Sequence, residues 1–377
     1  MFKRVNNIAF VFLFLLLFFL PLLFTDWRSG GTSEKENRNL AKFPSLITDN
    51  KLNITFTQEF DSWFMDHMGF RDVLITANRS LHEKVFDRSI SNSNIKTGRT
   101  GDVIYATDEI IRDFAHVNLR TDDDVAHIGQ SYQIISDWLA EKNIPFYYVQ
   151  CVDKQTIYPE RFIENVQQFG TVSKTDQVLT YLEEQTSVNA IYFKDVMEEQ
   201  RLQHNVFSHW GDATHWTPRG AFICYNYMME RINDTLDYQL KILSESDYDI
   251  SVYTMYGPDD AYEEIEDFKI RNPKAKESDV SVMGPWATDY RHRVWINTEA
   301  DNDKRLLLMG DSYFSDYLLA SLAESFREVW MVWGDYTWAF TQIVELCNPD
   351  IVIYECAERV DRSEDICILA QNLDSAN

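Results

Sequence analysis

Short apolar runs that alternate with helical segments constrain the fold more than any other feature of this 377-residue chain. Residues 305–309, 329–333 and 351–355 form such runs, and the segments 314–326 and 336–346 between them have the apolar spacing of helices. Continuous apolar strands joined by helices are typical of a parallel sheet that helices cover on both faces. We therefore expect an α/β fold, with ligands bound beyond the carboxyl ends of the strands.

The same alternation begins earlier in the chain. A helix over 124–142 precedes a β-rich run at 144–152, and a helix over 174–185 precedes a strand at 190–193. A Thr-Pro pair, which favours the start of a helix, then opens a helix over 218–233. These elements extend the predicted sheet towards the N-terminus.

Two stretches fall outside this alternation. Residues 240–300 are acidic and rich in tyrosine, and we interpret them as an insertion with short strands. Residues 26–120 form an N-terminal lead and helical segment. We therefore predict a membrane segment at 1–25, this lead, and a sheet domain over 121–377.

The N-terminus indicates where the protein works. Lys3 and Arg4 precede 17 residues without a charge at 8–24, and Pro21 lies near their far end. A cleaved signal peptide and an uncleaved signal anchor both fit such a segment. The flank at 25–28 has no small-x-small cleavage site, which favours a single-pass anchor. The positive-inside rule then places the rest of the chain outside the cytoplasm, in the periplasm or extracellular space.

The charge and the cysteines exclude some classes of protein. The chain has 35 Lys and Arg against 60 Asp and Glu, a net charge of −25. Nucleic-acid binding needs a basic face, so we expect no nucleic-acid partner. The five cysteines are widely spaced without a CxxC pair, which argues against a disulfide scaffold or a cysteine zinc site. Buried thiols and one or two bridges stay open as alternatives.

Ser312 is the candidate nucleophile. It follows the apolar run 305–309 and opens the next helix, where its hydroxyl would be exposed beside backbone N–H groups that can bind an oxyanion. A nucleophilic serine needs a base, and the base needs an orienting group. His215 and Asp212 offer both within four residues. Taken singly, Ser312 is also explained as a helix cap and His215 as a packing residue, but together they predict a Ser-His-Asp triad.

The two blocks resemble those of a known enzyme class. GDS at 310–312 and DxxH at 212–215 are similar to the signature blocks of SGNH (GDSL-type) hydrolases, in which the serine block comes first. Here the order is reversed. A circular permutation of the SGNH hydrolase-like domain would explain this order.

The chain as a whole resembles the AlgX/AlgJ group of polysaccharide O-acetyltransferases, which have a permuted SGNH hydrolase-like domain. The resemblance extends from about residue 33 to residue 360 and depends on the order and spacing of its blocks. These are SEKENRNLAKFP at 33–44, FD at 60–61, DHMGFRD at 66–72, VDK at 152–154, IYP at 157–159, THWT at 214–217, GDS at 310–312, PDIV at 349–352 and ER at 358–359.

The resemblance implies roles for the candidate residues. Ser312 would accept the acetyl group, His215 would act as general base and acid, and Asp212 would orient the imidazole. Family members commonly have the aspartate two residues before the histidine, where this chain has Ala213, so Asp212 takes the spacing of ordinary SGNH hydrolases. The Gly-x-Asn-Asp block of secreted SGNH esterases is absent. We therefore assign the oxyanion hole to the N–H groups of Ser312 and Gly334.

Five residues near predicted strand ends are candidates for substrate binding: Lys154, Trp216, Tyr313, Tyr336 and Arg359. Lys154 either meets an anionic group or forms a solvated salt bridge. Arg359 either binds substrate or pairs with Glu355 or Glu358. The aromatic residues either stack on sugar rings or belong to the core. His209 with Asp212 and His215 also fits a metal cluster, but the last two fit the triad and we expect no metal.

We expect a membrane-anchored, extracytoplasmic O-acetyltransferase that modifies an exopolysaccharide through an acetyl-serine intermediate. An SGNH-type carbohydrate esterase with the same triad is one alternative, and a non-catalytic accessory protein of a polysaccharide biosynthesis complex is another. The intact triad favours an enzyme. The resemblance implies no cofactor, because a membrane-bound O-acyltransferase partner would relay the acetyl group across the membrane. The net charge favours a neutral polymer over a polyuronate.

Overall fold

The computed structural model describes residues 94–376 and, in the N-terminal part, residues 14, 19–20, 22–27, 31–33, 38–48, 51–53, 55–71 and 73. The chain divides into two compact units, Met1–Asn92 and Ser93–Asn377. The smaller unit contains two hairpins and a helix: β1 (Gly31–Ser33) with β2 (Arg38–Leu40), β3 (Ile47–Thr48) with β4 (Lys51–Leu52), and α2 (Phe56–His67). The buried face of α2 centres on Trp63, whose ring lies 4.8 Å from that of Phe43.

Most of the predicted membrane segment at 8–24 lies outside the described residues. Residues 34–37 and Asp72 of the AlgX/AlgJ-like blocks lie outside them as well. Among the residues that are described, no helix is both long and apolar enough to cross a membrane. The anchor stays a prediction.

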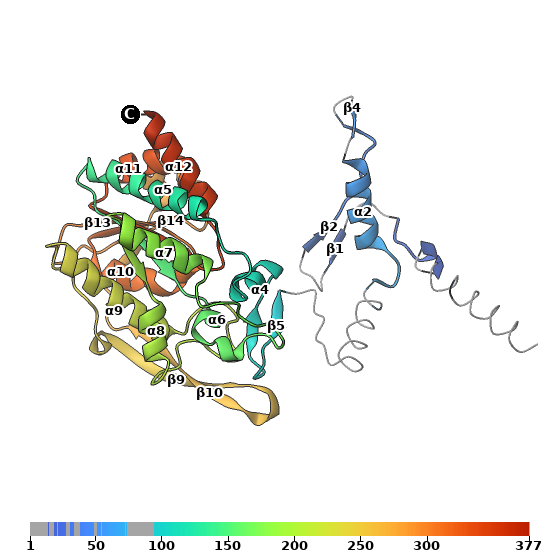
Figure 1. Cartoon of the computed structure of the whole chain (residues 1–377), viewed down its shortest axis with the longest axis horizontal. Helices are drawn as coiled ribbons and strands as arrows, with labels where there is room; N and C mark the ends of the chain where they lie inside the picture. Colours follow the sequence, from blue (N-terminus) through green and yellow to red (C-terminus); the bar gives the residue numbers. More distant parts are fainter. Residues whose placement is uncertain are drawn as a thin grey trace, which may run out of the picture. The chain divides into compact units, whose positions relative to one another are not determined.

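A mostly parallel sheet forms the centre of the larger unit, and its strands β13 and β14 are labelled in Figure 1. It has seven strands, in the order β11-β12-β14-β13-β15-β7-β8. The parallel strands are β7 (Phe146–Cys151), β8 (Asn189–Tyr192), β13 (Arg305–Gly310), β14 (Glu328–Trp333) and β15 (Ile351–Ala357). Two antiparallel strands, β12 (Arg293–Ile296) and β11 (Lys276–Ser278), extend one edge. The expectation of a parallel sheet inside an α/β fold is confirmed.

Helices cover both faces of this sheet. One face carries α5 (Asp122–Ala140), α7 (Lys174–Gln185), α11 (Phe340–Cys347) and α12 (Ser363–Ala376), and the other α8 (Lys194–Gln200), α9 (Pro218–Thr235) and α10 (Leu319–Ser325). Successive side chains of a strand point to opposite faces. In β13, Leu306 and Leu308 therefore join the core under α9 and α10, while Leu307 and Met309 join the core under α5 and α11.

Local signals place the helix starts. The side chain of Thr217 accepts the N–H of Gly220, and Pro218 occupies the first helical turn of α9. Ser173 and Asp176 form a capping box at α7. The predicted helix over 314–326 is interrupted, because a π-helical turn, η5 (Phe314–Leu318), precedes α10. Such turns are common at functional sites.

The predicted insertion over 240–300 divides into two parts. The hairpin β9 (Tyr248–Tyr256) and β10 (Tyr262–Ile270) stands apart from the sheet, as an insertion would. By contrast, β11 and β12 belong to the sheet, since β12 pairs with β14. Interpreting the whole stretch as an insertion was wrong for these two strands, because β12 pairs with β14, more than 30 residues further along the chain, and β11 pairs with β12.

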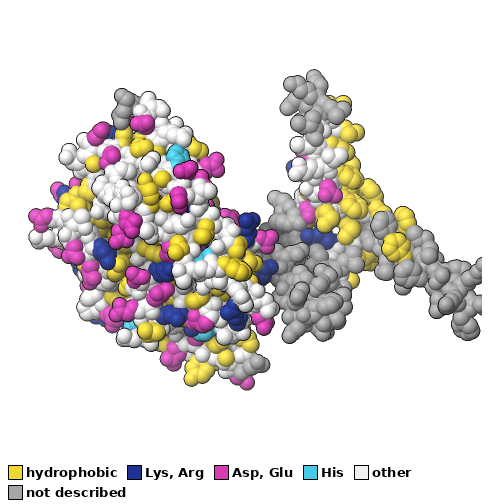
Figure 2. Space-filling model, viewed as in Figure 1, with side chains coloured by type: hydrophobic (Ala, Val, Ile, Leu, Met, Phe, Trp, Pro, Cys, Tyr) yellow, Lys and Arg dark blue, Asp and Glu magenta, His cyan; other side chains and the backbone are white. Residues whose placement is uncertain are grey.

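The division after residue 92 differs from the boundary that we predict at 120. The elements β5 (Ile95–Thr97), β6 (Val103–Tyr105) and α4 (Asp108–Phe114) belong to the larger unit. Phe114 packs on Phe162 with 4.1 Å between ring centroids. Short helices complete this unit: α6 (Lys154–Ile157), η1 (Pro159–Arg161), η2 (Glu245–Asp247), η3 (Pro258–Asp260), η4 (Val280–Thr288) and η6 (Tyr336–Ala339). On the face shown in Figure 2, its Lys and Arg side chains are interspersed with Asp and Glu.

Candidate active site

The structure brings Ser312, His215 and Asp212 together, although 97 residues separate the serine from the histidine. Ser312 Oγ lies 2.7 Å from His215 Nε2, and His215 Nδ1 lies 2.8 Å from Asp212 Oδ2. With Nδ1 protonated and donating to Asp212, Nε2 accepts the hydroxyl proton of Ser312. This chain of contacts can activate a serine for nucleophilic attack.

Asp212 is held as an anion by the turn that it begins. Its Oδ1 accepts the N–H and hydroxyl of Thr214 and the N–H of His215, at 2.7, 2.7 and 3.0 Å. Burial raises the pKa of the Asp212 carboxyl, but the hydrogen bonds from His215 and Thr214 outweigh burial and leave the pKa below its usual range. Asp212 therefore stays ionised at neutral pH and can stabilise a protonated imidazole.

Ser312 sits where strand β13 gives way to a helix. Asp311 caps that helix: its Oδ1 accepts the N–H of Tyr313 at 2.9 Å, and its Oδ2 accepts the N–H of Ala357 at 3.1 Å. As the first helical residue, Ser312 has an N–H without an intrahelical acceptor. That N–H and the helix dipole favour negative charge on a substrate oxygen beside the hydroxyl.

Gly310 allows a close approach between the ends of β13 and β15. A Cβ at this position would lie 2.5 Å from Glu355 Oε2. That same oxygen accepts the N–H of Asp311 at 2.8 Å. Burial, with the neighbouring Asp311 carboxylate, raises the pKa of the Glu355 carboxyl well above its ordinary value. Gly310 and Glu355 thus fix the turn that presents Ser312.

Glu263, from β10, braces the loop that carries His215. Its buried carboxylate accepts the N–H groups of His209 and Trp210, at 2.9 and 3.2 Å, and the side chains of Ser208 and Asn205, at 2.5 and 2.7 Å. Burial raises the pKa of Glu263, but these four donors outweigh burial and lower it. Sequence reasoning missed Glu263, because nothing distinguishes it from the other acidic residues of the hairpin.

Strand β6 also supports the loop that carries His215. The N–H groups of Val103 and Tyr105 donate to the carbonyls of His209 and Ala213, at 2.8 and 3.2 Å. The Lys154 ammonium donates to the carbonyls of Val103 and His209, at 2.7 and 3.4 Å. The loop is therefore held by both an N-terminal strand and the β9–β10 hairpin.

Tyr317 connects His215 with a large aromatic cavity. Its ring centroid lies 5.5 Å from that of His215. The cavity has a volume of about 640 Å³ and lies beside α9, β10 and α10. Burial and the nearby Asp212 carboxylate raise the pKa of Tyr317 to about 12, so it stays a neutral hydrogen-bond donor. Sequence reasoning did not single out Tyr317, although it lies one helical turn beyond Ser312.

With this geometry in view, the chain can be compared with solved structures. It is similar in fold to PatB1 of Bacillus cereus, with a TM-score of 0.52 and 16% identity over 72% of this chain and 96% of PatB1. At this identity the likeness shows the fold alone. Looser similarity links the chain to the O-acetyltransferase domain of Pseudomonas putida AlgJ (TM-score 0.46, 14% identity, 74% of this chain and 99% of that domain) and to Pseudomonas aeruginosa AlgX (0.45, 13%, 74% and 67%). No family model and no curated protein sequence matches the chain.

Three of the predicted substrate-binding residues are buried, and the prediction is corrected for them. Lys154 and Trp216 are each 1% exposed, and Tyr313 is fully buried. The Lys154 ammonium donates to the carbonyls of Val103 and His209, inside the protein. Since successive helical residues are rotated by about 100°, Tyr313 turns inward where Ser312 turns outward. Its hydroxyl lies 2.6 Å from the carbonyl of Thr214, and its ring packs edge-on against Trp216.

The predicted oxyanion role of Gly334 is also wrong, because its N–H donates to the carbonyl of Gly310 at 2.8 Å. Tyr336 packs at an angle against His292, and its hydroxyl donates to Asp289 at 3.1 Å. Arg359 pairs with Asp153 at 2.6 Å rather than with a neighbouring glutamate. The substrate roles of Tyr336 and Arg359 stay predictions.

His209 does not join the triad residues around a metal. Its Nδ1 lies 2.9 Å from Asp102 Oδ1, at the turn before β6. Within residues 94–376 and the described N-terminal segments, no group of three or more His, Cys, Asp or Glu side chains is arranged to hold an ion. The five cysteines are free thiols, four of them buried.

Proposed function

We propose that the chain is an O-acetyltransferase that modifies an exopolysaccharide through an acetyl-Ser312 intermediate. The single observation that carries the proposal is the contact of Ser312 Oγ with His215 Nε2, extended to Asp212, at the carboxyl edge of the sheet. The sequence blocks that resemble those of the AlgX/AlgJ group support the same conclusion, and the likeness to PatB1 supports the fold that places this contact.

In the first half-reaction, Ser312 Oγ attacks the carbonyl carbon of a donor acetyl ester while His215 Nε2 takes the hydroxyl proton. The Ser312 N–H stabilises the oxyanion of the tetrahedral intermediate. His215 then returns the proton to the leaving oxygen, and acetyl-Ser312 forms. In the second half-reaction a sugar hydroxyl attacks this ester, His215 takes its proton, and the proton passes to Ser312 as the acetylated sugar departs.

The acetyl group would reach Ser312 from a membrane-bound O-acyltransferase partner, without a cofactor of this chain. We place the catalytic unit outside the cytoplasm, held at the membrane by the segment at 8–24. Tethering would keep the enzyme near both the donor and the nascent polymer. An esterase that acts on finished polymer would benefit less from being tethered to the membrane.

The first experiment asks whether Ser312 carries the acetyl group. The purified full-length chain is incubated with 4-nitrophenyl acetate, and its mass is followed. We expect a gain of one acetyl group that Ser312→Ala abolishes, with a loss of stability below about 1–2 kcal/mol. Ser315→Ala is the matched control, because Ser315 lies on the same helical turn and donates to Asp316. Acetylation of Ser312→Ala at the wild-type rate would refute the nucleophile assignment.

The second experiment separates transfer from hydrolysis, since water and a sugar hydroxyl can attack the same acetyl-serine. The acetyl donor is supplied with and without oligosaccharides, and acetylated sugar is measured against free acetate. We expect that adding an acceptor oligosaccharide increases the yield of acetylated sugar and decreases the yield of free acetate. Rapid acetate release that no oligosaccharide alters would favour the carbohydrate esterase. No turnover by a folded chain, with or without the membrane partner, would favour an accessory role.

A further inference from the structure

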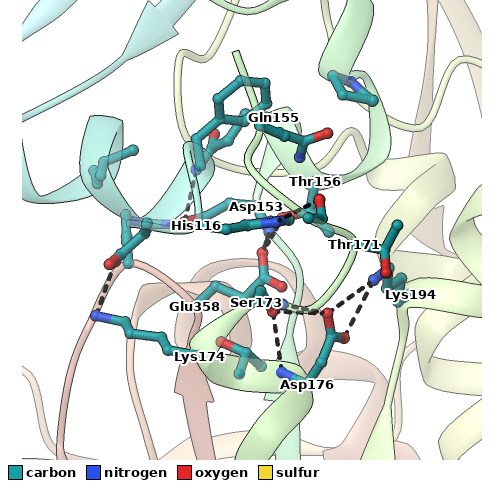
Figure 3. A pocket seen from close by; sticks show the side chains of 18 of the residues that line it. His116, Asp153, Gln155, Thr156, Thr171, Ser173, Lys174, Asp176, Lys194 and Glu358 are labelled. Atoms are coloured by element: carbon teal, nitrogen blue, oxygen red, sulfur yellow. Dashed lines mark hydrogen bonds and ion pairs between the residues drawn. The ribbon is translucent and has the colours of Figure 1, made fainter. Parts of the chain in front are cut away.

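A polar cavity of about 260 Å³ lies at the carboxyl ends of β7, β8 and β15 (Figure 3). Asp153 follows β7, Lys194 follows β8, and Glu358 follows β15. Its opposite wall comes from α4, from a loop that includes Thr171, and from the start of α7. None of these groups takes part in the serine chemistry proposed above.

The cations that line the cavity are paired with carboxylates. Lys174 Nζ lies 2.9 Å from Asp113, Lys194 Nζ lies 3.2 Å from Asp176, and Arg359 lies 2.6 Å from Asp153 (Figure 3 shows the two lysines). The walls therefore offer donors and acceptors side by side. A sugar hydroxyl can accept a hydrogen bond from the cation of such a pair and donate one to the carboxylate. A ligand group with a single charge is attracted by only one of the two.

The charges on the walls disfavour an acidic ligand. Five acidic side chains line the cavity against three cations, which are Lys174, Lys194 and Arg359. The acidic residues are Asp113, Asp153, Asp176, Glu198 and Glu358. A further carboxylate would meet more negative than positive charge at close range, and such repulsion disfavours binding. A hydroxylated ligand without a carboxylate carries no such penalty.

The buried Tyr313, which directly follows the nucleophile in sequence, contacts two groups of the cavity wall. The guanidinium of Arg359 lies 4.8 Å from the centre of the Tyr313 ring, and the Tyr313 hydroxyl lies 3.1 Å from Asp153. Tyr313 directly follows Ser312, and β15 is the neighbour of β13 in the sheet. The cavity and the serine thus share one edge of the sheet, where a ligand of an α/β protein binds.

We propose that this cavity is a subsite for one non-acidic sugar residue of the acceptor polysaccharide. The inference rests on the proposed function and specifies its substrate class. The volume of the cavity is close to the lower end of the ~300–1,000 Å³ range of ligand pockets, which suits a single sugar ring. Holding one residue here would position a hydroxyl of another residue for attack on acetyl-Ser312.

The test measures binding, not catalysis, so that it can fail independently of the proposed function. Full-length Ser312→Ala is titrated by calorimetry with cellotriose, mannotriose, N,N′,N″-triacetylchitotriose and trigalacturonate. We expect at least one neutral trisaccharide to bind and trigalacturonate to bind at least tenfold more weakly. Tighter binding of trigalacturonate, or no binding of any of the four, would overturn the proposal. The proposed function has its own test: a wild-type protein that forms no acetyl-Ser312 would contradict the nucleophile assignment, whatever the outcome of the binding experiment.

Two variants of one exposed loop locate the site. Thr171 lines the cavity, whereas its neighbour Val172 is exposed and does not. In the Ser312→Ala background, Thr171→Trp should weaken binding of the neutral trisaccharide at least tenfold, and Val172→Trp should leave it unchanged. Equal effects of the two variants, with equal thermal stability, would place the sugar elsewhere and overturn the assignment.

Discussion

At the scale of single residues, the candidate site depends on side chains that never touch the reacting atoms. Glu263 satisfies four donors of the loop before His215. Asp311 caps the helix that begins with Ser312 and also binds the end of β15. Because buried polar groups cost about 1–3 kcal/mol when their partners are removed, such residues link stability to activity.

Replacing Glu263 with Gln should lower both the acetylation rate and the stability. The Gln amide would place an N–H₂ group against donors that now meet a carboxylate, so we expect a rate at least tenfold lower and a loss of about 1–3 kcal/mol. The measurements are the rate of acetyl-Ser312 formation and urea unfolding. Glu264→Gln, on the exposed face of the same strand, should behave as wild type. A wild-type rate in Glu263→Gln would contradict the bracing role.

Lys154 should make stability rise with pH. Burial lowers its pKa from 10.5 to about 8. Between pH 8 and 10.5 the unfolded chain keeps a proton that the folded chain releases, so the free energy of unfolding increases with pH. Relative to Lys154→Met, wild type should gain up to about 3 kcal/mol between pH 7 and 10.5. Urea unfolding of both proteins at several pH values tests this. If the difference in unfolding free energy between the two proteins did not change with pH, the lowered pKa of Lys154 would be contradicted.

At the scale of elements, the turn between β13 and the following helix decides where Ser312 points. This turn depends on the contact of Gly310 with Glu355, and the π-helical turn η5 follows at once. The supporting β5–β6 and β9–β10 hairpins lie far from Ser312 in sequence. The site therefore requires three separate elements to be packed correctly.

Gly310→Ala should disrupt this turn. Its Cβ would lie 2.5 Å from Glu355 Oε2, so the chain must shift, with an expected loss of about 1–3 kcal/mol and slower acetylation of Ser312. Gly334→Ala is the matched control, since the nearest atom to its Cβ would be 3.4 Å away, at an ordinary contact distance. Thermal unfolding and acetylation rates of the two variants provide the test. Equal tolerance of both substitutions would contradict the close-approach role of Gly310.

At the scale of the whole molecule, the candidate site belongs to one of the two compact units. That unit begins before β5, so the N-terminal lead is divided between a separate unit and a part that supports the site. The interspersed charges in Figure 2 show that the net charge of −25 is not confined to one patch of the face in view. The proposed sugar subsite beside Arg359 is accordingly a cavity and not a charged patch of this face.

Truncation distinguishes the two boundaries. The fragment 93–377 should fold and form acetyl-Ser312 at close to the full-length rate. The fragment 121–377 lacks β6 and exposes Phe162, which Phe114 now covers, so it should unfold at a markedly lower temperature and lose acetylation. Thermal denaturation and intact-mass measurements compare the fragments. Equal stability and rate in both would support the boundary at 120.

The sequence by itself determined those features of the protein that depend on residues close together in the chain. The apolar runs and their helical partners follow from local periodicity, and the starts of α7 and α9 follow from caps within three residues. The pair Asp212 and His215 is also local, because one tight turn joins them. Ser312 could be placed at a strand end for the same reason.

Only the tertiary structure decided what depends on distant pairing. It brought Ser312 to His215, and it buried Lys154 and Tyr313, which the sequence predicts to face substrate. Whether a polar or aromatic side chain near a strand end faces a cleft or the core depends on which strands and helices pack around it. That packing is a property of contacts between segments far apart in the chain, and local patterns carry no record of it.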